Sequence, residues 1–177
     1  YIDTSGGQAK NEAELIKKYR ETATIPECDA AIEDIVNEAI VSVEDGAPVD
    51  INLNGLEQPD RIKKIIRDEF ENVVALLNFS SMGSDIFRRW YVDGRLYYHL
   101  IIDDKSPKKG IVELRPIDPR RIRKVKEIDE DKDPETGAAI IKNVTEYYLY
   151  QDSAMTKSNQ GLKIAKDSIV YVPSGLL

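Results

Sequence analysis

The chain has 177 residues, of which 41% are apolar and 32% are charged, and its formal net charge is −7. A chain of this length buries about 70% of its unfolded surface and folds without disulfides or metal ions. Its single cysteine, Cys28, excludes an intrachain disulfide, and no apolar run approaches the roughly 20 residues of a membrane-spanning helix. We therefore expect one globular domain, residues 1–177, suited to a reducing, intracellular site of assembly.

The ends of the chain suggest an excised piece of a larger polypeptide. The first residue is Tyr1 rather than Met, and the chain stops at Leu177 without a tail. The N-terminal residues are polar and lack the pattern of a secretory signal peptide. We expect a fragment of a longer chain, with a helical part (1–93) and a β-rich part (94–177).

Apolar periodicity predicts four amphipathic helices in the first half of the chain. Asn11 and Glu14 have the spacing of a capping box at the start of the first helix. The apolar residues from Ile62 to Leu77 recur every three or four positions and give the strongest helical pattern. A break at Gly83 is expected before the last helix. The expected helices span about 11–22, 27–43, 60–78 and 82–92.

After residue 94 the pattern changes to short apolar or alternating runs separated by turn residues, which is typical of strands. These runs predict a mostly antiparallel sheet over about 95–172, with the helices packed on it. The expected fold class is therefore α+β. The structural anchors expected at the joint between the two parts, and at the turn within the sheet, are Phe87, Trp90, Tyr91, Gly94, Pro116 and Pro119.

Candidate catalytic and metal-binding residues form no recognisable pattern. His99 is the only histidine and lies far in sequence from Cys28, so no nucleophile–base pair is predicted. Aspartates 129, 131 and 133 have the spacing of the first EF-hand ligands, but Pro134 and Ile140 occupy the positions where that loop needs glycine and glutamate. We expect no enzymatic activity, no metal site, no cofactor and no small-molecule substrate.

Basic residues concentrate in residues 105–126, which we call the basic ribbon. The ribbon has nine Lys or Arg against two carboxylates, a charge of +7, so the rest of the chain carries −14 within the total of −7. A basic segment on an acidic body indicates oriented contact with a charged partner. The candidate contact residues are Arg115, Arg120, Arg121, Arg123, Lys124 and Lys126.

Two interpretations of the basic ribbon remain open. In the first, its cations bind phosphates and nearby tyrosines stack on bases, as in a single-stranded nucleic-acid-binding domain. In the second, its arginines pair with carboxylates of the same or a neighbouring chain, and the tyrosines pack in the sheet. The acidity of the rest of the chain favours the second interpretation. The tyrosines concerned are Tyr97, Tyr98, Tyr147, Tyr148 and Tyr150.

Three stretches together resemble the portal proteins, or head-to-tail connectors, of T-even-like contractile-tailed bacteriophages. They are residues 28–39, residues 85–95 (DIFRRWYVDGR) and residues 113–122 (ELRPIDPRRI). The second and third, in this order and at this spacing, are the most specific. The resemblance covers nearly the whole chain but only part of a portal subunit, and it implies the wing region that precedes the stem.

The resemblance implies a structural, non-enzymatic role. Portal proteins of this family form a dodecameric ring at one capsid vertex, through which the terminase pumps double-stranded DNA and to which neck and tail later attach. The implied partners are other copies of the chain, terminase, major capsid or scaffold proteins and neck proteins. The implied locations are the virion and, during assembly, the bacterial host cytoplasm. In this family the wing chiefly supports ring and capsid contacts, so the resemblance favours protein over DNA as the partner of the basic ribbon.

Overall fold

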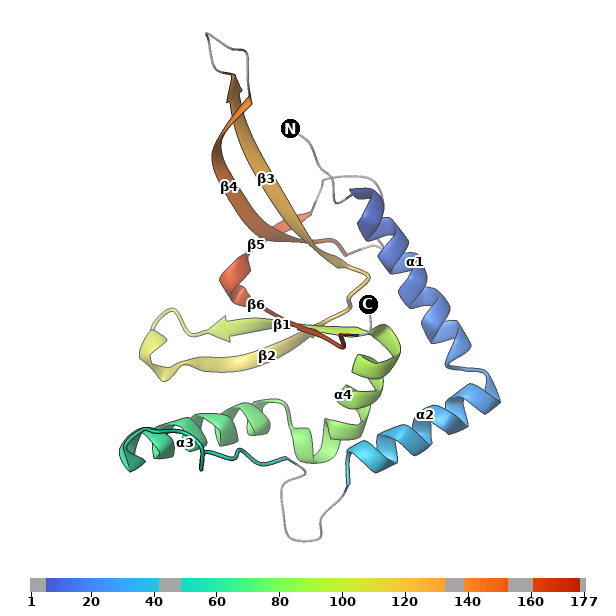
Figure 1. Cartoon of the computed structure of the whole chain (residues 1–177), viewed down its shortest axis with the longest axis vertical. Helices are drawn as coiled ribbons and strands as arrows, with labels where there is room; N and C mark the ends of the chain where they lie inside the picture. Colours follow the sequence, from blue (N-terminus) through green and yellow to red (C-terminus); the bar gives the residue numbers. More distant parts are fainter. Residues whose placement is uncertain (1–5, 42–48, 133–138, 153–160, 176–177) are drawn as a thin grey trace.

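The computed structural model describes residues 6–41, 49–132, 139–152 and 161–175. Within these residues four helices are followed by six strands, which confirms the expected α+β fold (Figure 1). The helices are α1 (Gly6–Thr22), α2 (Pro26–Ala39), α3 (Asp60–Leu76) and α4 (Phe79–Asp93). The strands are β1 (Arg95–Ile102), β2 (Ile111–Ile117), β3 (Ile122–Lys132), β4 (Ala139–Tyr150), β5 (Leu162–Ala165) and β6 (Ile169–Pro173). None of the described helices is long and apolar enough to cross a membrane.

Helix α1 begins earlier than expected, and helix α2 ends earlier than expected. The prediction of a capping box was wrong, because α1 begins at Gly6 and Asn11 therefore lies inside the helix. Helix α2 ends at Ala39, earlier than expected, because Ile40 leaves the helical region with φ −114°. The expected continuation to residue 43 reaches positions 42 and 43, which lie outside the described residues.

The break between α3 and α4 lies at Asn78 and not at Gly83. Asn78 has φ 47°, a left-handed conformation that asparagine tolerates better than most side chains. Gly83 instead lies buried within α4, where an added Cβ would come within 3.1 Å of the Phe79 ring. The glycine therefore allows this ring to pack closely against its own helix.

The strands form two three-stranded antiparallel sheets rather than the single sheet expected. The first has the order β2-β1-β6 and the second the order β3-β4-β5. In the first sheet Tyr97 lies opposite both Ile117 and Tyr171, which places β1 at the centre. The chain passes from the first sheet to the second between β2 and β3, where Pro119 has no amide hydrogen with which to continue a ladder.

The main apolar core lies where the two sheets meet. Its buried members come from both sheets: Tyr97, Ile122, Tyr148, Ile164 and Ile169. The rings of Tyr97 and Tyr148 meet edge to face with their centroids 6.0 Å apart, and Tyr97 also stacks on Tyr171 at 4.9 Å. Aromatic pairs at these separations contribute about 0.5–1.5 kcal/mol beyond their buried area.

Helix α4 connects the helical part to the sheets, because it packs against α1, α2, α3 and β1. The Phe87 ring lies 5.5 Å from Trp90 and 6.5 Å from Tyr91, so three of the expected anchors form one aromatic cluster on this helix. Gly94 ends the helix with φ 71°, and its amide donates to the Trp90 carbonyl at 3.0 Å. Figure 1 shows α2 and α3 on opposite sides of α4.

Candidate interaction surface

The basic ribbon is divided between the two sheets. Lys105, Lys108 and Lys109 are exposed in the β1–β2 connection, at the far end of the first sheet. Arg115 lies on β2 of that sheet, whereas Lys126 lies on β3 of the second sheet. The cations that are continuous in sequence therefore do not form one continuous strip on the sheets.

Two of the candidate arginines are paired with carboxylates two residues away. Arg115 donates from Nε and Nη2 to the two oxygens of Glu113, at 2.9 and 3.1 Å. Arg120 donates from Nη2 to Asp118 Oδ2 at 2.7 Å, and its backbone amide donates to Asp118 Oδ1 at 2.9 Å. Their positive charges are thus largely neutralised within the chain.

Lys124 on β3 is also paired. Its partner is the carboxylate of Glu146 on β4, which also binds Lys166 in the segment after β5. The Lys124 Nζ lies 3.0 Å from Glu146 Oε2, and Lys166 donates to the same oxygen at 2.6 Å. Hydrogen bonds from Lys166 and Lys124 lower the pKa of Glu146 to about 2. This carboxylate therefore stays ionised throughout the neutral range.

The other three candidates differ in accessibility. Arg123 is buried, with 8% of its surface exposed. Arg121 and Lys126 are exposed, and in the described part of the chain neither forms an ion pair. Of the six predicted contact residues, Arg121 and Lys126 are the ones whose charge is most available to a partner.

The tyrosines near the ribbon are engaged in the sheets. Burial raises the pKa of both Tyr97 and Tyr148, whose rings lie in the core. The Tyr147 hydroxyl donates to Glu127 at 2.9 Å, and the Lys163 ammonium lies 4.5 Å from the centre of the same ring. The ring faces that would stack on bases already contact protein groups in these three cases.

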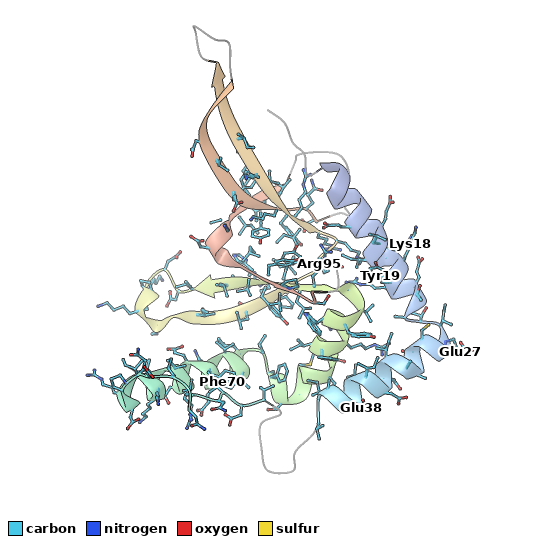
Figure 2. The ribbon with its side chains drawn as sticks, viewed as in Figure 1. Lys18, Tyr19, Glu27, Glu38, Phe70 and Arg95 are labelled. Carbon is cyan, nitrogen blue, oxygen red and sulfur yellow. The ribbon has the colours of Figure 1, made fainter. Side chains whose placement is uncertain are left out.

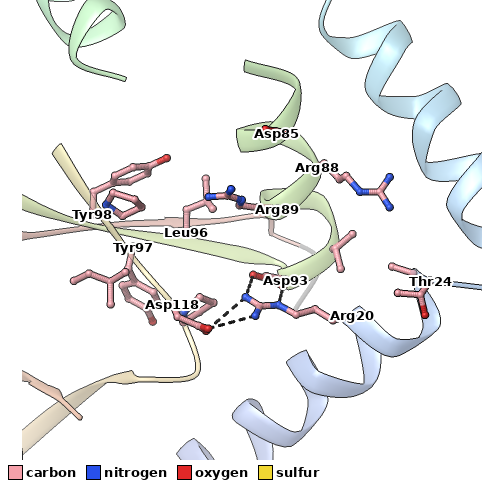
Figure 3. Close-up of a pocket in the computed structure, with 15 residues that line it drawn as sticks. Arg20, Thr24, Asp85, Arg88, Arg89, Asp93, Leu96, Tyr97, Tyr98 and Asp118 are labelled. Atoms are coloured by element: carbon pink, nitrogen blue, oxygen red, sulfur yellow. Dashed lines mark hydrogen bonds and ion pairs between the residues drawn. The ribbon is translucent and has the colours of Figure 1, made fainter. Parts of the chain in front are cut away.

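One partly buried ionic contact among the described residues involves side chains that were not predicted from the sequence. Arg20 on α1 donates from Nε and Nη2 to the two oxygens of Asp93, at 2.8 and 2.6 Å, and Figure 3 shows this fork-like contact. Arg20 also donates to Asp118 at 3.3 Å. The Asp93 side chain at the end of α4 is only 3% exposed. A single guanidinium thus connects α1, the end of α4 and the β2–β3 turn.

Charge and hydrogen bonding stabilise the ionised state of this cluster. Burial raises the pKa of Asp118, but hydrogen bonds from Arg120 and the charges of Arg20 and Arg120 outweigh it and lower the pKa to about 2. The hydrogen bond with Asp93 is the largest cause of the raised pKa of Arg20. No sequence pattern indicates the cluster, because Arg20 lies 73 residues from Asp93 and 98 residues from Asp118.

Comparison with known proteins agrees with the resemblance seen in the sequence. Residues 12–177 match the profile of the family described as "Bacteriophage T4-like portal protein (Gp20)". The chain belongs to this family. A portal protein of Vibrio phage KVP40 is 39% identical over 173 residues, which cover 93% of this chain and 33% of the relative. A portal protein of Salmonella phage ViI is 34% identical over 176 residues, which cover 91% of this chain and 31% of the relative.

The predicted membership of the T4-like portal family is therefore confirmed. The chain spans about a third of the length of the portal proteins that it matches. The match includes both sheets, α2, α3 and α4, and most of α1, so the Arg20–Asp93–Asp118 cluster lies wholly within the portal-family region.

A cavity of about 570 Å³ lies beside this cluster in the portal segment. Its lining combines apolar residues of α4 and β1 with charged residues, among them Arg88 and Arg89 (Figure 3). Arg88 is paired with Asp29 of α2. In the described residues no group of three or more His, Cys, Asp or Glu could hold a metal ion. The EF-hand-like aspartate at position 133 lies outside the described residues.

Proposed function

We propose that the chain is a structural, non-enzymatic part of a phage portal subunit, corresponding to the wing region. One observation carries this proposal: nearly the whole chain matches the portal family, yet it covers only about a third of each relative. Such coverage is expected of one region of a larger subunit. The complete subunit would form a dodecameric ring at a capsid vertex and act in DNA packaging and ejection.

The partners of the complete protein follow from the same proposal. They are neighbouring portal subunits, terminase, major capsid or scaffold proteins and neck proteins, with double-stranded DNA passing through the ring. The protein would act in the virion and would assemble in the bacterial host cytoplasm. The observation that supports protein rather than DNA contacts for this segment is that Arg115, Arg120 and Lys124 already pair with carboxylates.

The decisive experiment extends the chain to the length of its relatives. Negative-stain imaging and light-scattering mass of the extended polypeptide should show rings with a central channel. A monodisperse monomer or dimer at high concentration would contradict the proposal.

Nucleic-acid binding by the basic ribbon is tested separately on the present chain. Fluorescence anisotropy with a labelled single strand should show weak or no binding at physiological salt. Tight binding with a steep salt dependence would instead favour the nucleic-acid-binding function. In that case R121Q/K126Q should weaken binding more than the matched control K105Q/K108Q, since the control lysines lie apart from them in the β1–β2 connection.

A further inference from the structure

Helix α2 has five carboxylates and no cation, whereas the N-terminal half of α3 (residues 60–67) is basic, and the two helices lie on opposite sides of α4. Both pack on α4, and Figure 1 shows them extending away from it in different directions. Each helix therefore has an outer face that α4 does not cover. The charged and apolar residues on these two faces indicate which kind of partner surface binds each of them in an assembly.

The outer face of α2 is acidic. The helix has five carboxylates and no Lys or Arg in its sequence, PECDAAIEDIVNEA. Glu27, Asp34 and Glu38 are exposed, and their spacing of seven and four residues places them on one side of the helix. Ala30 and Ala31 are exposed between them, so another helix can approach this side closely. Figure 2 marks the two ends of this acidic face with Glu27 and Glu38.

These acidic residues have no counter-charge of their own. Asp29 pairs with Arg88, but in the described residues Glu27, Asp34 and Glu38 form no ion pair. Apart from the paired Asp29, the helix has four carboxylates and no cation. These like charges repel one another unless a partner neutralises them.

The N-terminal half of α3 is the complementary surface. Residues 60–67 have four cations against one carboxylate, and Arg61, Lys64 and Arg67 are exposed. Among the described residues none of these three forms an ion pair.

Two exposed isoleucine side chains lie in the same half of the helix as these cations. Ile65 is 49% exposed and Ile62 is 40% exposed, although both belong to the apolar pattern of the helix. No residue of α3 is fully buried. The outer end of α3 therefore combines unpaired positive charge with apolar area, as expected of a surface that a protein partner covers.

We propose that the N-terminal half of α3 docks on the acidic face of α2 in a second copy of this chain. Lys64 and Arg61 would approach Asp34 and Glu38 of that copy, and Ile65 would pack against its small alanine side chains. The contact joins two different surfaces on opposite sides of the molecule. Such a heterologous contact, repeated from copy to copy, closes a ring when the rotation allows it. The inference rests on the proposed ring function and specifies one of its subunit contacts.

Charge reversal tests the pairing directly. Variant A is E27K/D34K/E38K and variant B is R61E/K64E/R67E. Each variant alone opposes like charges, so its self-association should be about tenfold weaker than that of the unmodified chain. An equimolar mixture of A and B opposes unlike charges at both contacts, and its association should return to the original level.

Sedimentation equilibrium at about 10 mM ionic strength measures these constants while surface charges are little screened. The matched control is K105E/K108E/K109E, which changes the net charge as much as variant B does but lies in the β1–β2 connection. This control should associate like the unmodified chain. An equal loss in the control, or a mixture of A and B that stays dissociated, would overturn the proposal. So would an unmodified chain that remains monomeric at about 1 mM.

Disulfide trapping identifies the surfaces and separates this inference from the proposed function. The variant C28S/A31C/I65C should oxidise to a ladder of multimers, because each copy offers both halves of a heterologous contact. Dimers alone, or no cross-linking, would refute the proposed contact. If the extended polypeptide forms rings without this cross-link, the α2–α3 contact is wrong while the portal function stands. If neither rings nor cross-links form, both proposals fail.

Discussion

Replacing Arg20 by methionine should destabilise the fold more than the loss of any surface cation. The substitution keeps an unbranched apolar side chain but removes the two hydrogen bonds to Asp93, at 2.8 and 2.6 Å, and the contact with Asp118. The Asp93 carboxylate, 3% exposed, would then lack its counter-charge. Breaking a fully buried pair in this way costs about 3–5 kcal/mol.

The expected cost is lower here, because the Arg20 side chain is 36% exposed and water can partly replace it. We expect a loss of about 2–3 kcal/mol in the free energy of unfolding. For a chain of this size that loss lowers the melting temperature by about 5–10 °C. Urea titrations at pH 7, followed by Trp90 fluorescence and by circular dichroism, measure the free energy directly.

The matched control is Arg115→Met. Arg115 also makes a fork-like contact, with Glu113, but its side chain is 58% exposed and water can replace the contact, so the free energy of unfolding should change little. Combining Arg20→Met with Asp93→Asn removes the uncompensated charge, and the double variant should be more stable than the sum of the single losses by about 1–2 kcal/mol. Equal losses in the Arg20 and Arg115 variants, or strict additivity in the cycle, would refute this account of the cluster.

Three further predictions concern single positions. Gly94→Ala should lower the free energy of unfolding by about 1–2 kcal/mol, since Gly94 has φ 71°. Gly55→Ala should change it little in the same urea titration, because a Cβ added at Gly55 meets no atom within 4 Å. Ile16→Ala should lower the free energy of unfolding by about 2–5 kcal/mol because the Ile16 side chain is 2% exposed. The neighbouring Leu15 is 42% exposed, so Leu15→Ala should lower it by under about 1 kcal/mol. Similar melting temperatures for the two variants would contradict the packing of α1. Asp118 has a pKa of about 2, below its ordinary value of 3.8, so it stabilises the fold above about pH 4 and this stabilisation is lost as the pH falls to about 2. Asp118→Asn should therefore flatten the dependence of stability on pH in this range, and an unchanged acid profile would show that another carboxylate dominates it.

The sequence by itself determined the elements and the family. The apolar residues from Ile62 to Leu77 repeat with the helical period, and this local pattern predicted α3 almost to its ends. The short alternating runs after Gly94 likewise predicted strands, and the stretches at 85–95 and 113–122 indicated the portal family that residues 12–177 match. These features are local, so they can be read from neighbouring residues alone.

Only the tertiary structure decided how the charged residues are used. Whether a cation is free depends on what lies next to it after folding: Arg120 is neutralised by Asp118, while Arg121, its neighbour in sequence, is exposed. The division into two sheets and the placement of α2 and α3 on opposite sides of α4 likewise depend on long-range packing. Arg20 and Asp93, 73 residues apart, meet because α1 packs against α4. A sequence pattern extends over one or two turns of a helix or one strand, and so it does not contain these contacts.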